Sequence, residues 1–290
     1  MSIGLAIAGG GLQGIAHIGV LKALEDLNIK IDYISGTSSG SIFAAMYAAG
    51  CNIDEMKEIA KKYYPELVKF EKRPIIKEVF RYIFKRKIDR TGLIDGIKIE
   101  NLVKSILKEK NINQISEVKI PLAIPTVDIL STKEVIFLSR KITLSNTKEI
   151  DYIYNVPISK AVRASMSFPG IFTTCEFENY EFVDGGTKDN LPVKILKDMG
   201  ATKTIGVSFS IDSYKKSKNI FSVLLRTVDI FSQKDVKAAQ EMADFYFEID
   251  NKSDVSLLKI DNLEKCYKLG YDETMKHKNE IFKIIMGKEN

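Results

Sequence analysis

Histidine and cysteine, which supply most protein ligands for transition metals, are scarce in this sequence. The 290 residues include two histidines, His17 and His277, and three cysteines, Cys51, Cys175 and Cys266. The cysteines are odd in number and far apart, which argues against a disulfide framework and indicates a reducing compartment. Because a structural zinc site would have too few ligands of these types, we expect no metal centre.

Uninterrupted apolar runs are also missing. Residues 1–21 and 33–53 contain no Lys, Arg, Asp or Glu and are long enough to cross a bilayer. However, glycines at 9–11 break the first window, and the Ser/Gly cluster at 35–41 breaks the second. The first window also lacks the basic region of a signal peptide. We therefore expect both windows to lie in the core of a cytoplasmic protein without a signal peptide or transmembrane segment.

Positive charge is concentrated in one segment. The net charge is +5, and residues 72–90 alone hold eight basic side chains against two acidic ones. Between Ile75 and Phe84 the apolar residues recur at helical spacing, while most basic residues fall elsewhere on the helix surface. Such a helix suits peripheral contact with an anionic membrane, but it also suits a cap that packs its apolar face on the protein. No nucleic-acid-binding module accompanies the charge, so we expect no nucleic-acid partner.

Short β-branched runs alternate with longer helical patterns along the chain, which is typical of an α/β fold. Ile3–Ala8 is almost wholly apolar, as a central parallel strand is. We predict a single three-layer domain over residues 1–290, with a mostly parallel central sheet and helices on both faces.

The expected strands lie at Ile3–Ala8, Ile31–Ser35, Pro121–Asp128, Glu134–Leu138, Thr204–Ser208 and Phe245–Ile249. The expected helices lie at Ile15–Leu27, Ser41–Ala49, Ile53–Tyr64, Ile75–Lys87, Lys98–Lys108, Val193–Met199, Phe221–Gln240 and Asn262–Ile285.

The segment Gly36-Thr37-Ser38-Ser39-Gly40 lies between an expected strand and an expected helix. There, a G-x-S-x-G pattern places its central serine on a sharp turn, with glycines that leave room for crossing backbones. The following helix directs its N-terminal N–H groups and partial positive charge toward that serine. Ser38 is therefore a candidate nucleophile, although a serine that only caps the helix would give the same pattern.

Gly9-Gly10-Gly11-Leu12-Gln13-Gly14 is a second glycine-rich turn between a strand and a helix. As G-x-G-x-x-G it fits a dinucleotide fingerprint, whereas beside a nucleophile its exposed N–H groups fit an oxyanion hole. A dinucleotide site needs an acidic residue at the end of the next strand. That strand ends in Ser35-Gly36, and its one acid, Asp32, lies near its start. We therefore favour the oxyanion hole.

A nucleophilic serine needs a general base. His17 follows the glycine loop on a helix, where a packing or capping role is commoner, and His277 lies in a charged terminal helix. Asp184 follows an apolar strand and precedes two glycines, in the segment Phe182-Val183-Asp184-Gly185-Gly186. Because parallel α/β sheets bind ligands at the carboxyl ends of strands, Asp184 is the best candidate, with a turn-forming role as the alternative.

Together these elements resemble the patatin-like phospholipase family, in which a glycine-rich oxyanion loop, a G-x-S-x-G motif and a D-G-G/A motif occur in this order. The similarity extends over about residues 3–210 and includes the stretches Ala16–Leu24, Leu122–Asp128 and Ala164–Phe172. We expect residues 65–93 to form an insertion that acts as a cap or faces a membrane. Residues 211–290 are expected to form a mainly helical C-terminal part.

The resemblance implies a lipid acyl hydrolase of the phospholipase A or lysophospholipase type that needs no metal or organic cofactor. Ser38 attacks the ester carbonyl of a phospholipid or another fatty-acyl ester, and Asp184 accepts its proton. The loop Gly9, Gly10 and Gly11 and the N–H of Ser39 hold the oxyanion. The motif glycines are completed by Gly14, Gly36, Gly40, Gly185 and Gly186.

Two points of the resemblance stay open. The family often has a basic residue where Gln13 stands, so phosphate pairing by this position is in doubt. A protein that keeps the fold but only binds lipid, or acts as a scaffold, is the alternative to an enzyme.

Overall fold

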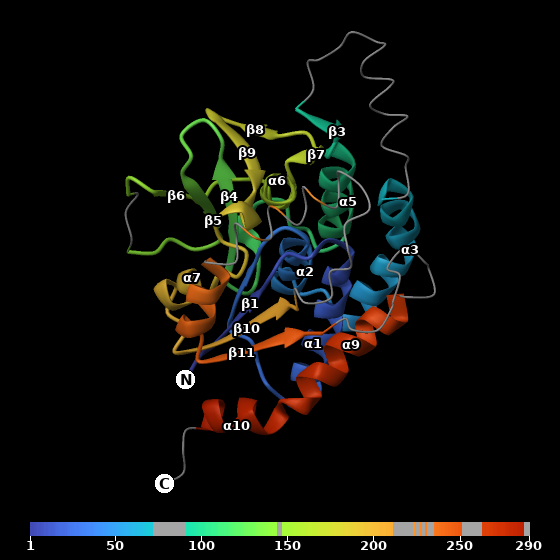
Figure 1. Cartoon of the computed structure of the whole chain (residues 1–290), viewed down its shortest axis with the longest axis vertical. Helices are drawn as coiled ribbons and strands as arrows, with labels where there is room; N and C mark the ends of the chain where they lie inside the picture. Colours follow the sequence, from blue (N-terminus) through green and yellow to red (C-terminus); the bar gives the residue numbers. More distant parts are fainter. Residues whose placement is uncertain are drawn as a thin grey trace.

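A nine-stranded, mostly parallel sheet forms the centre of the structure (Figure 1). The computed structural model describes residues 1–71, 91–143, 147–210, 235–250 and 263–286, together with 223, 227 and 230. The basic segment 72–90 and most of the helix expected over Phe221–Gln240 therefore lie outside the described residues. Residues 65–71 continue a helix, and 92–94 form a short strand.

The strand order is β11-β10-β1-β2-β4-β5-β6, and β9 joins β4 to β8. Neighbours from β11 to β4 are parallel, as are β5 and β6, whereas β5 and β9 both run antiparallel to β4. The strand bounds are β1 Ile3–Ile7, β2 Tyr33–Gly36, β4 Leu122–Asp128, β5 Glu134–Leu138, β6 Ile150–Ile153, β8 Cys175–Phe177, β9 Tyr180–Asp184, β10 Lys203–Phe209 and β11 Phe245–Ile249. A separate two-stranded sheet pairs β3 (Gly92–Ile94) with β7 (Gly170–Phe172).

Two strands share one side of β4 and meet there end to end. The first residues of β4 pair with β2 through Ile34–Leu122 and Ser35–Ala123. Further along, β4 pairs with β9, which arrives from the opposite direction and ends at Asp184 beside Thr126. The carboxyl ends of β2 and β9 therefore face each other across the middle of β4. This arrangement brings Asp184 to the edge of the sheet where Ser38 lies.

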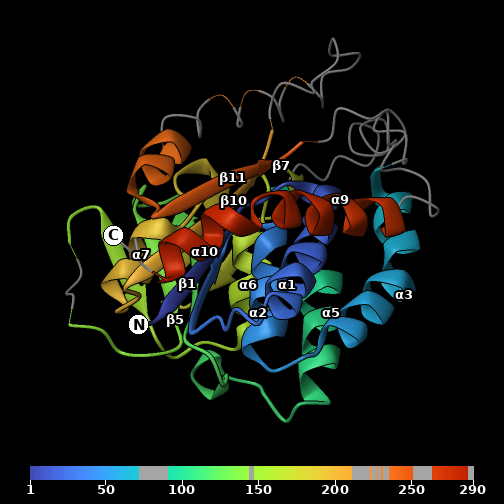
Figure 2. The same cartoon turned by 90° about the horizontal axis from the view of Figure 1, so that it is seen from below.

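Helices cover both faces of the sheet unequally (Figures 1 and 2). Alternate residues of β1 point to opposite faces: Leu5 and Ile7 belong to the main core, and Ala6 and Ala8 to a smaller one that includes Leu196 of α7. On the main-core side lie α1 Ala16–Asp26, α2 Ser39–Ala48, α3 Ile53–Glu71, α5 Ile97–Lys108, α6 Ile158–Ser165 and α9 Leu263–Lys276. On the other side lie α7 Val193–Asp198 and a helix over 235–242. None of the helices in the described ranges combines the length and apolarity needed to cross a membrane.

The sequence pattern and the observed elements differ at several places. The helix expected over Asn262–Ile285 is two helices, α9 and α10 (Lys278–Met286), because the chain turns at His277, whose N–H bonds to the Thr274 carbonyl at 3.1 Å. The helix expected from Ile15 begins as a 3₁₀ turn, η1 (Gly11–Ile15), and becomes α1 at Ala16. Five elements with no expected counterpart, β3, β6, β7, β8 and α6, are at most eight residues long and carry little periodicity.

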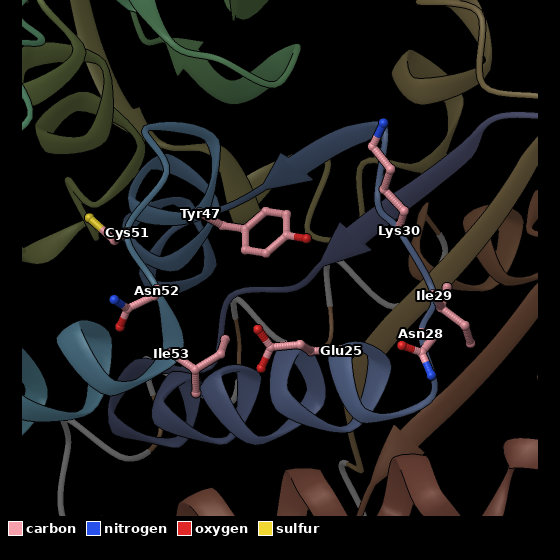
Figure 3. Close-up of a pocket in the computed structure, with 8 residues that line it drawn as sticks. All are labelled: Glu25, Asn28, Ile29, Lys30, Tyr47, Cys51, Asn52 and Ile53. Atoms are coloured by element: carbon pink, nitrogen blue, oxygen red, sulfur yellow. The ribbon is translucent and has the colours of Figure 1, made fainter.

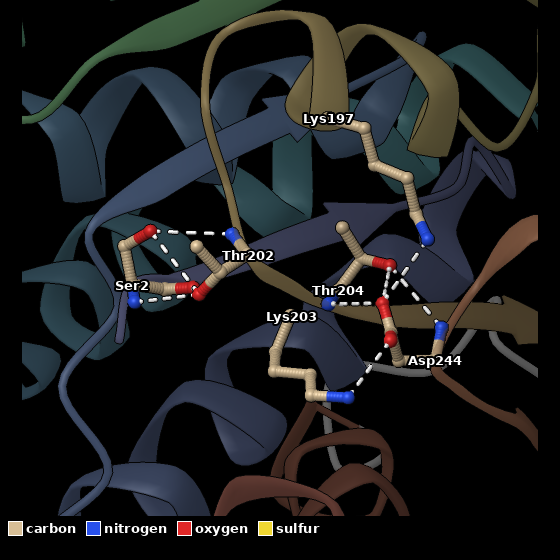
Figure 4. A network of polar contacts seen from close by, with 6 residues as sticks. All are labelled: Ser2, Lys197, Thr202, Lys203, Thr204 and Asp244. Carbon is tan, nitrogen blue, oxygen red and sulfur yellow. Dashed lines mark hydrogen bonds and ion pairs between the residues drawn. The ribbon is translucent and has the colours of Figure 1, made fainter.

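A network of polar contacts fastens the amino edge of the sheet (Figure 4). Asp244, just before β11, accepts hydrogen bonds from the Thr204 N–H at 3.0 Å and the Thr204 hydroxyl at 2.9 Å. Lys197 and Lys203 form ion pairs with the same carboxylate, each at 3.2 Å. These contacts tie α7, β10 and β11 together at the end of the sheet opposite Ser38.

Candidate active site

Ser38 occupies a strained turn between β2, which ends at Gly36, and α2, which begins at Ser39. Its φ of 51° and ψ of −125° fall in a region that glycine normally occupies. A non-glycine residue there costs about 1–3 kcal/mol. Close packing sustains the turn, since a Cβ added to Gly40 would lie 2.6 Å from the Ile7 carbonyl oxygen of β1. The predicted sharp elbow at Ser38 is present.

Asp184 lies within hydrogen-bond distance of Ser38. The Ser38 hydroxyl donates to Oδ2 of Asp184 at 2.6 Å, across 146 positions of the chain. The other carboxylate oxygen, Oδ1, accepts the N–H of Gly186 at 2.8 Å, which fixes the orientation of the side chain. Asp184 also begins the 3₁₀ turn η3 (Gly185–Thr187), so it forms a turn as well as contacting Ser38.

Burial changes the acidity of Asp184. The residue is 2% exposed, and this burial raises the pKa of its carboxyl from 3.8 to about 7, against the hydrogen bonds from Ser38 and Gly186. A general base works best when its pKa lies near the operating pH. The carboxylate can therefore both accept and return a proton near neutral pH.

The C-terminal end of α6 holds both Ser38 and Asp184. The Ser165 hydroxyl accepts the N–H of Ser38 at 3.0 Å, and the Ser167 carbonyl accepts the N–H of Asp184 at 3.0 Å. Arg163, 4% exposed, donates to the Ser167 hydroxyl at 2.5 Å and to the Thr173 carbonyl at 2.6 Å. Sequence reasoning noted this stretch only as part of a resemblance, because its contacts with Ser38 and Asp184 exist only after folding.

Replacing Ser165 by alanine should lower kcat about tenfold or more with little change in KM. The substitution leaves the partly buried N–H of Ser38 without its acceptor, which costs about 1–3 kcal/mol and loosens the strained turn. Steady-state kinetics on a soluble ester measure the effect. Ser159→Ala is the matched control, since Ser159 is a buried serine of the same helix whose hydroxyl bonds to neither Ser38 nor Asp184 in the described structure. An equal loss in both variants would contradict a positioning role for Ser165.

The glycine loop packs directly on the Ser38 turn. A Cβ added to Gly9 would lie 2.7 Å from the Ser38 Cβ, so only glycine allows this approach. The N–H of Gly9 donates to Asn190 Oδ1 and the N–H of Gly10 to Ser39 Oγ, both at 3.1 Å. Within the described residues, the N–H groups of Gly11 and Ser39 have no protein acceptor. They are the two unengaged donors of the predicted oxyanion hole.

Neither histidine bonds to Ser38 or Asp184 within the described part of the chain. His17 is completely buried, and its Nε2–H donates to the Ala8 carbonyl, immediately before the glycine loop, at 2.8 Å. Burial lowers the pKa of His17 to about 4, so the ring is neutral at neutral pH. His277, between α9 and α10, packs against the rings of Phe245 and Phe247. The structural role predicted for His17 agrees with these contacts.

A cavity of about 320 Å³ lies away from Ser38, beyond the C-terminal ends of α1 and α2 (Figure 3). Its walls include Glu25 and Asn28 from the α1 side and Tyr47 and Asn52 from the α2 side. Because α2 runs from Ser39 to Ala48, the cavity and Ser38 lie at opposite ends of this helix. The cavity therefore has no part in the candidate active site.

The fold and the Ser38 turn define an α/β protein with a strand–turn–helix elbow at the carboxyl edge of a mostly parallel sheet. Residues 5–197 match the profile of the family described as patatin-like phospholipase. The chain belongs to this family, as the sequence motifs indicated.

Relatives in sequence and structure agree with this assignment. Lysophospholipase NTE1 of Candida albicans is 31% identical over 80% of this chain, and an NTE family protein of Mycobacterium tuberculosis is 29% identical over 72%. The chain aligns with 15% and 49% of their respective lengths, so it matches only part of each protein. The ExoU–SpcU complex of Pseudomonas aeruginosa has the same fold, with a TM-score of 0.53 at 15% identity, over 99% of this chain and 52% of that chain.

Proposed function

We propose that this protein hydrolyses fatty-acyl esters of lipids, with Ser38 as nucleophile and Asp184 as general base. The observation that carries the proposal is the 2.6 Å hydrogen bond from the Ser38 hydroxyl to a carboxylate that is 2% exposed. No histidine takes part, so the pair acts as a dyad.

The reaction proceeds in two steps. Ser38 Oγ forms a bond to the ester carbonyl carbon, and its proton passes to Asp184 Oδ2. When the tetrahedral intermediate collapses, the bond to the alcohol oxygen breaks and Asp184 returns the proton to the departing alcohol. Water then attacks the acyl-serine and gives a proton to Asp184. Ser38 recovers a proton as the fatty acid leaves.

The developing oxyanion needs donors in fixed positions. The N–H groups of Gly11 and Ser39 are available to donate hydrogen bonds to this oxyanion. The partial positive charge at the start of α2 adds to their effect. The N–H of Gly10 is directed toward Ser39 Oγ and adds a third donor only when that hydroxyl moves aside. Loss of one such donor typically costs about 10²–10³-fold in turnover.

A lipid panel tests the proposal. Purified protein is incubated with phospholipids, lysophospholipids and neutral glycerides, and released fatty acids are measured by mass spectrometry. The relatives named lysophospholipase make lysophospholipids the first substrate to examine. We expect acyl release from at least one class, without added metal. Folded protein that binds these lipids but releases no acid from any of them would favour the lipid-binding or scaffold alternative.

A further inference from the structure

Two large apolar side chains project into solvent from the turn between β4 and β5. Ile129 is 50% exposed and Leu130 is 67% exposed. Apart from Met1, Leu130 is the most exposed large apolar residue of the described ranges. Turns normally carry Gly, Asn, Asp or Ser at such positions. Adjacent apolar residues held out in this way indicate an interaction surface.

The fold holds this turn firmly in its projecting conformation. Asp128, 3% exposed, accepts the Ser131 N–H at 2.9 Å and the Ser131 hydroxyl at 2.5 Å, and the N–H of Leu130 bonds to the same carboxylate. The Ile129 N–H donates to the Glu181 carbonyl at 2.9 Å, on the neighbouring strand β9. The apolar side chains are therefore presented by a braced turn.

The turn lies at the same edge of the sheet as Ser38. It follows the carboxyl end of β4, which runs parallel to β2, and in Figure 1 it is the green loop beside β8 and β9, far from both chain ends. Glu181, which bonds to the turn, precedes Asp184 by three residues on β9. At about 3.3 Å per residue, the base of the turn lies about 10 Å from the candidate general base.

The chemistry of the turn suits the surface of a lipid bilayer. The N–H groups of Ile129, Leu130 and Ser131 are already bonded within the protein, so they need no water. Lys133, at the end of the turn, is ion-paired with Asp151 at 3.0 Å. Insertion of the tip therefore buries apolar surface while Lys133 keeps its ion-pair partner.

We propose that Ile129 and Leu130 insert into the surface of phospholipid membranes and bring the lipid to the edge that carries Ser38. This inference rests on the proposed function, since it assigns a membrane as the form in which the substrate is met. It is separate from the basic segment 72–90, because it depends on apolar burial.

The double variant Ile129→Ser/Leu130→Ser tests the proposal. Binding is measured by flotation with phosphatidylcholine vesicles at physiological salt, where attraction between basic residues and anionic lipid is absent. We expect partition of the variant to fall at least about tenfold, because two largely exposed aliphatic side chains no longer enter the bilayer. Met242→Ser is the matched control: Met242 is 38% exposed but precedes β11, at the opposite edge of the sheet. Its partition should not change.

Hydrolysis assays separate this inference from the proposed function. The double variant should keep its rate on a water-soluble short-chain ester and lose at least about tenfold on vesicle phospholipid. Equal vesicle binding by variant and parent, or equal loss on both substrates, would overturn the inference. A parent that is dimeric and a variant that is monomeric would also overturn it, in favour of self-association. If no ester is hydrolysed, the proposed function fails, while the flotation result still decides the role of the turn.

Discussion

Replacing Asp184 by asparagine should abolish turnover and make the protein more stable above neutral pH. Asparagine keeps the size of the side chain and can still accept the Gly186 N–H, but it cannot take the proton of Ser38. We expect kcat/KM to fall about 10³–10⁴-fold, the effect of losing a general base. Near-normal hydrolysis by Asp184→Asn would exclude the dyad.

The stability gain follows from the pKa of Asp184. Burial raises this pKa from 3.8 to about 7, so between these values the folded state binds a proton that the unfolded state releases. Stability consequently falls as pH rises through this window and levels off above about pH 7. Ionisation of buried Asp184 therefore lowers the free energy of unfolding by about 4 kcal/mol in full, and the Asp184→Asn variant does not lose this stability because asparagine carries no charge. Urea unfolding at pH 5 and pH 8 should show a larger excess stability of the variant at pH 8.

Asp244→Asn provides the control of opposite sign. Burial opposes ionisation of Asp244, but its hydrogen bonds with Thr204, Lys197 and Lys203 outweigh burial and lower its pKa (Figure 4). Its charge therefore stabilises the fold at neutral pH, and the asparagine variant should be less stable than the parent there. If both substitutions changed the free energy of unfolding equally, burial of the Asp184 charge would not be the cause of the stability gain in Asp184→Asn.

The same pKa predicts how the proposed hydrolysis should depend on pH. Only ionised Asp184 can accept the Ser38 proton, so kcat/KM should fall about tenfold per pH unit below about pH 7 and be constant above it. Because the pKa of His17 lies at about 4, its protonation belongs to a more acidic range and does not produce this inflection. A profile that is flat from pH 5 to pH 8 would contradict the assigned base.

Replacing Ser38 by alanine should remove turnover by about 10⁴-fold or more and abolish labelling by a fluorophosphonate. In the proposed mechanism this hydroxyl forms the bond to the acyl group, and no neighbouring side chain occupies its position on the strained turn. Ser39→Ala is the control for labelling, since Ser39 Oγ faces Gly10 and not Asp184. A label that persists in Ser38→Ala would place the nucleophile elsewhere.

Ser38→Gly should also be inactive, but it should be more stable than Ser38→Ala. Both variants lack the hydroxyl, whereas only glycine adopts a φ of 51° and ψ of −125° without strain. We expect a difference of about 1–3 kcal/mol in the free energy of unfolding. Comparison of the two variants therefore separates the conformational free energy of the turn from the chemical role of the hydroxyl.

The sequence by itself determined the features that depend on neighbouring residues. Apolar β-branched runs predicted the positions of β1, β4, β5, β10 and β11, and the glycines around Ser38 predicted a strand–turn–helix elbow. It did not reveal α6 as a support for the site, because Ser165 makes its contact with Ser38 across 127 positions of the chain. Nor did it reveal the projecting turn, since solvent exposure of Ile129 and Leu130 depends on what packs around them.

Only the tertiary structure decided how Ser38 and Asp184 meet. Asp184 was predicted as the carboxyl end of a strand at the ligand-binding edge, and it does lie at that edge. However, β9 reaches it in the direction opposite to β2, and both strands share one side of β4. Conformational preferences act over a few residues, whereas this meeting depends on how distant strands pair, which no local pattern encodes. The elbow is thus a property of the sequence around Ser38, and the contact between Ser38 and Asp184 is a property of the sheet.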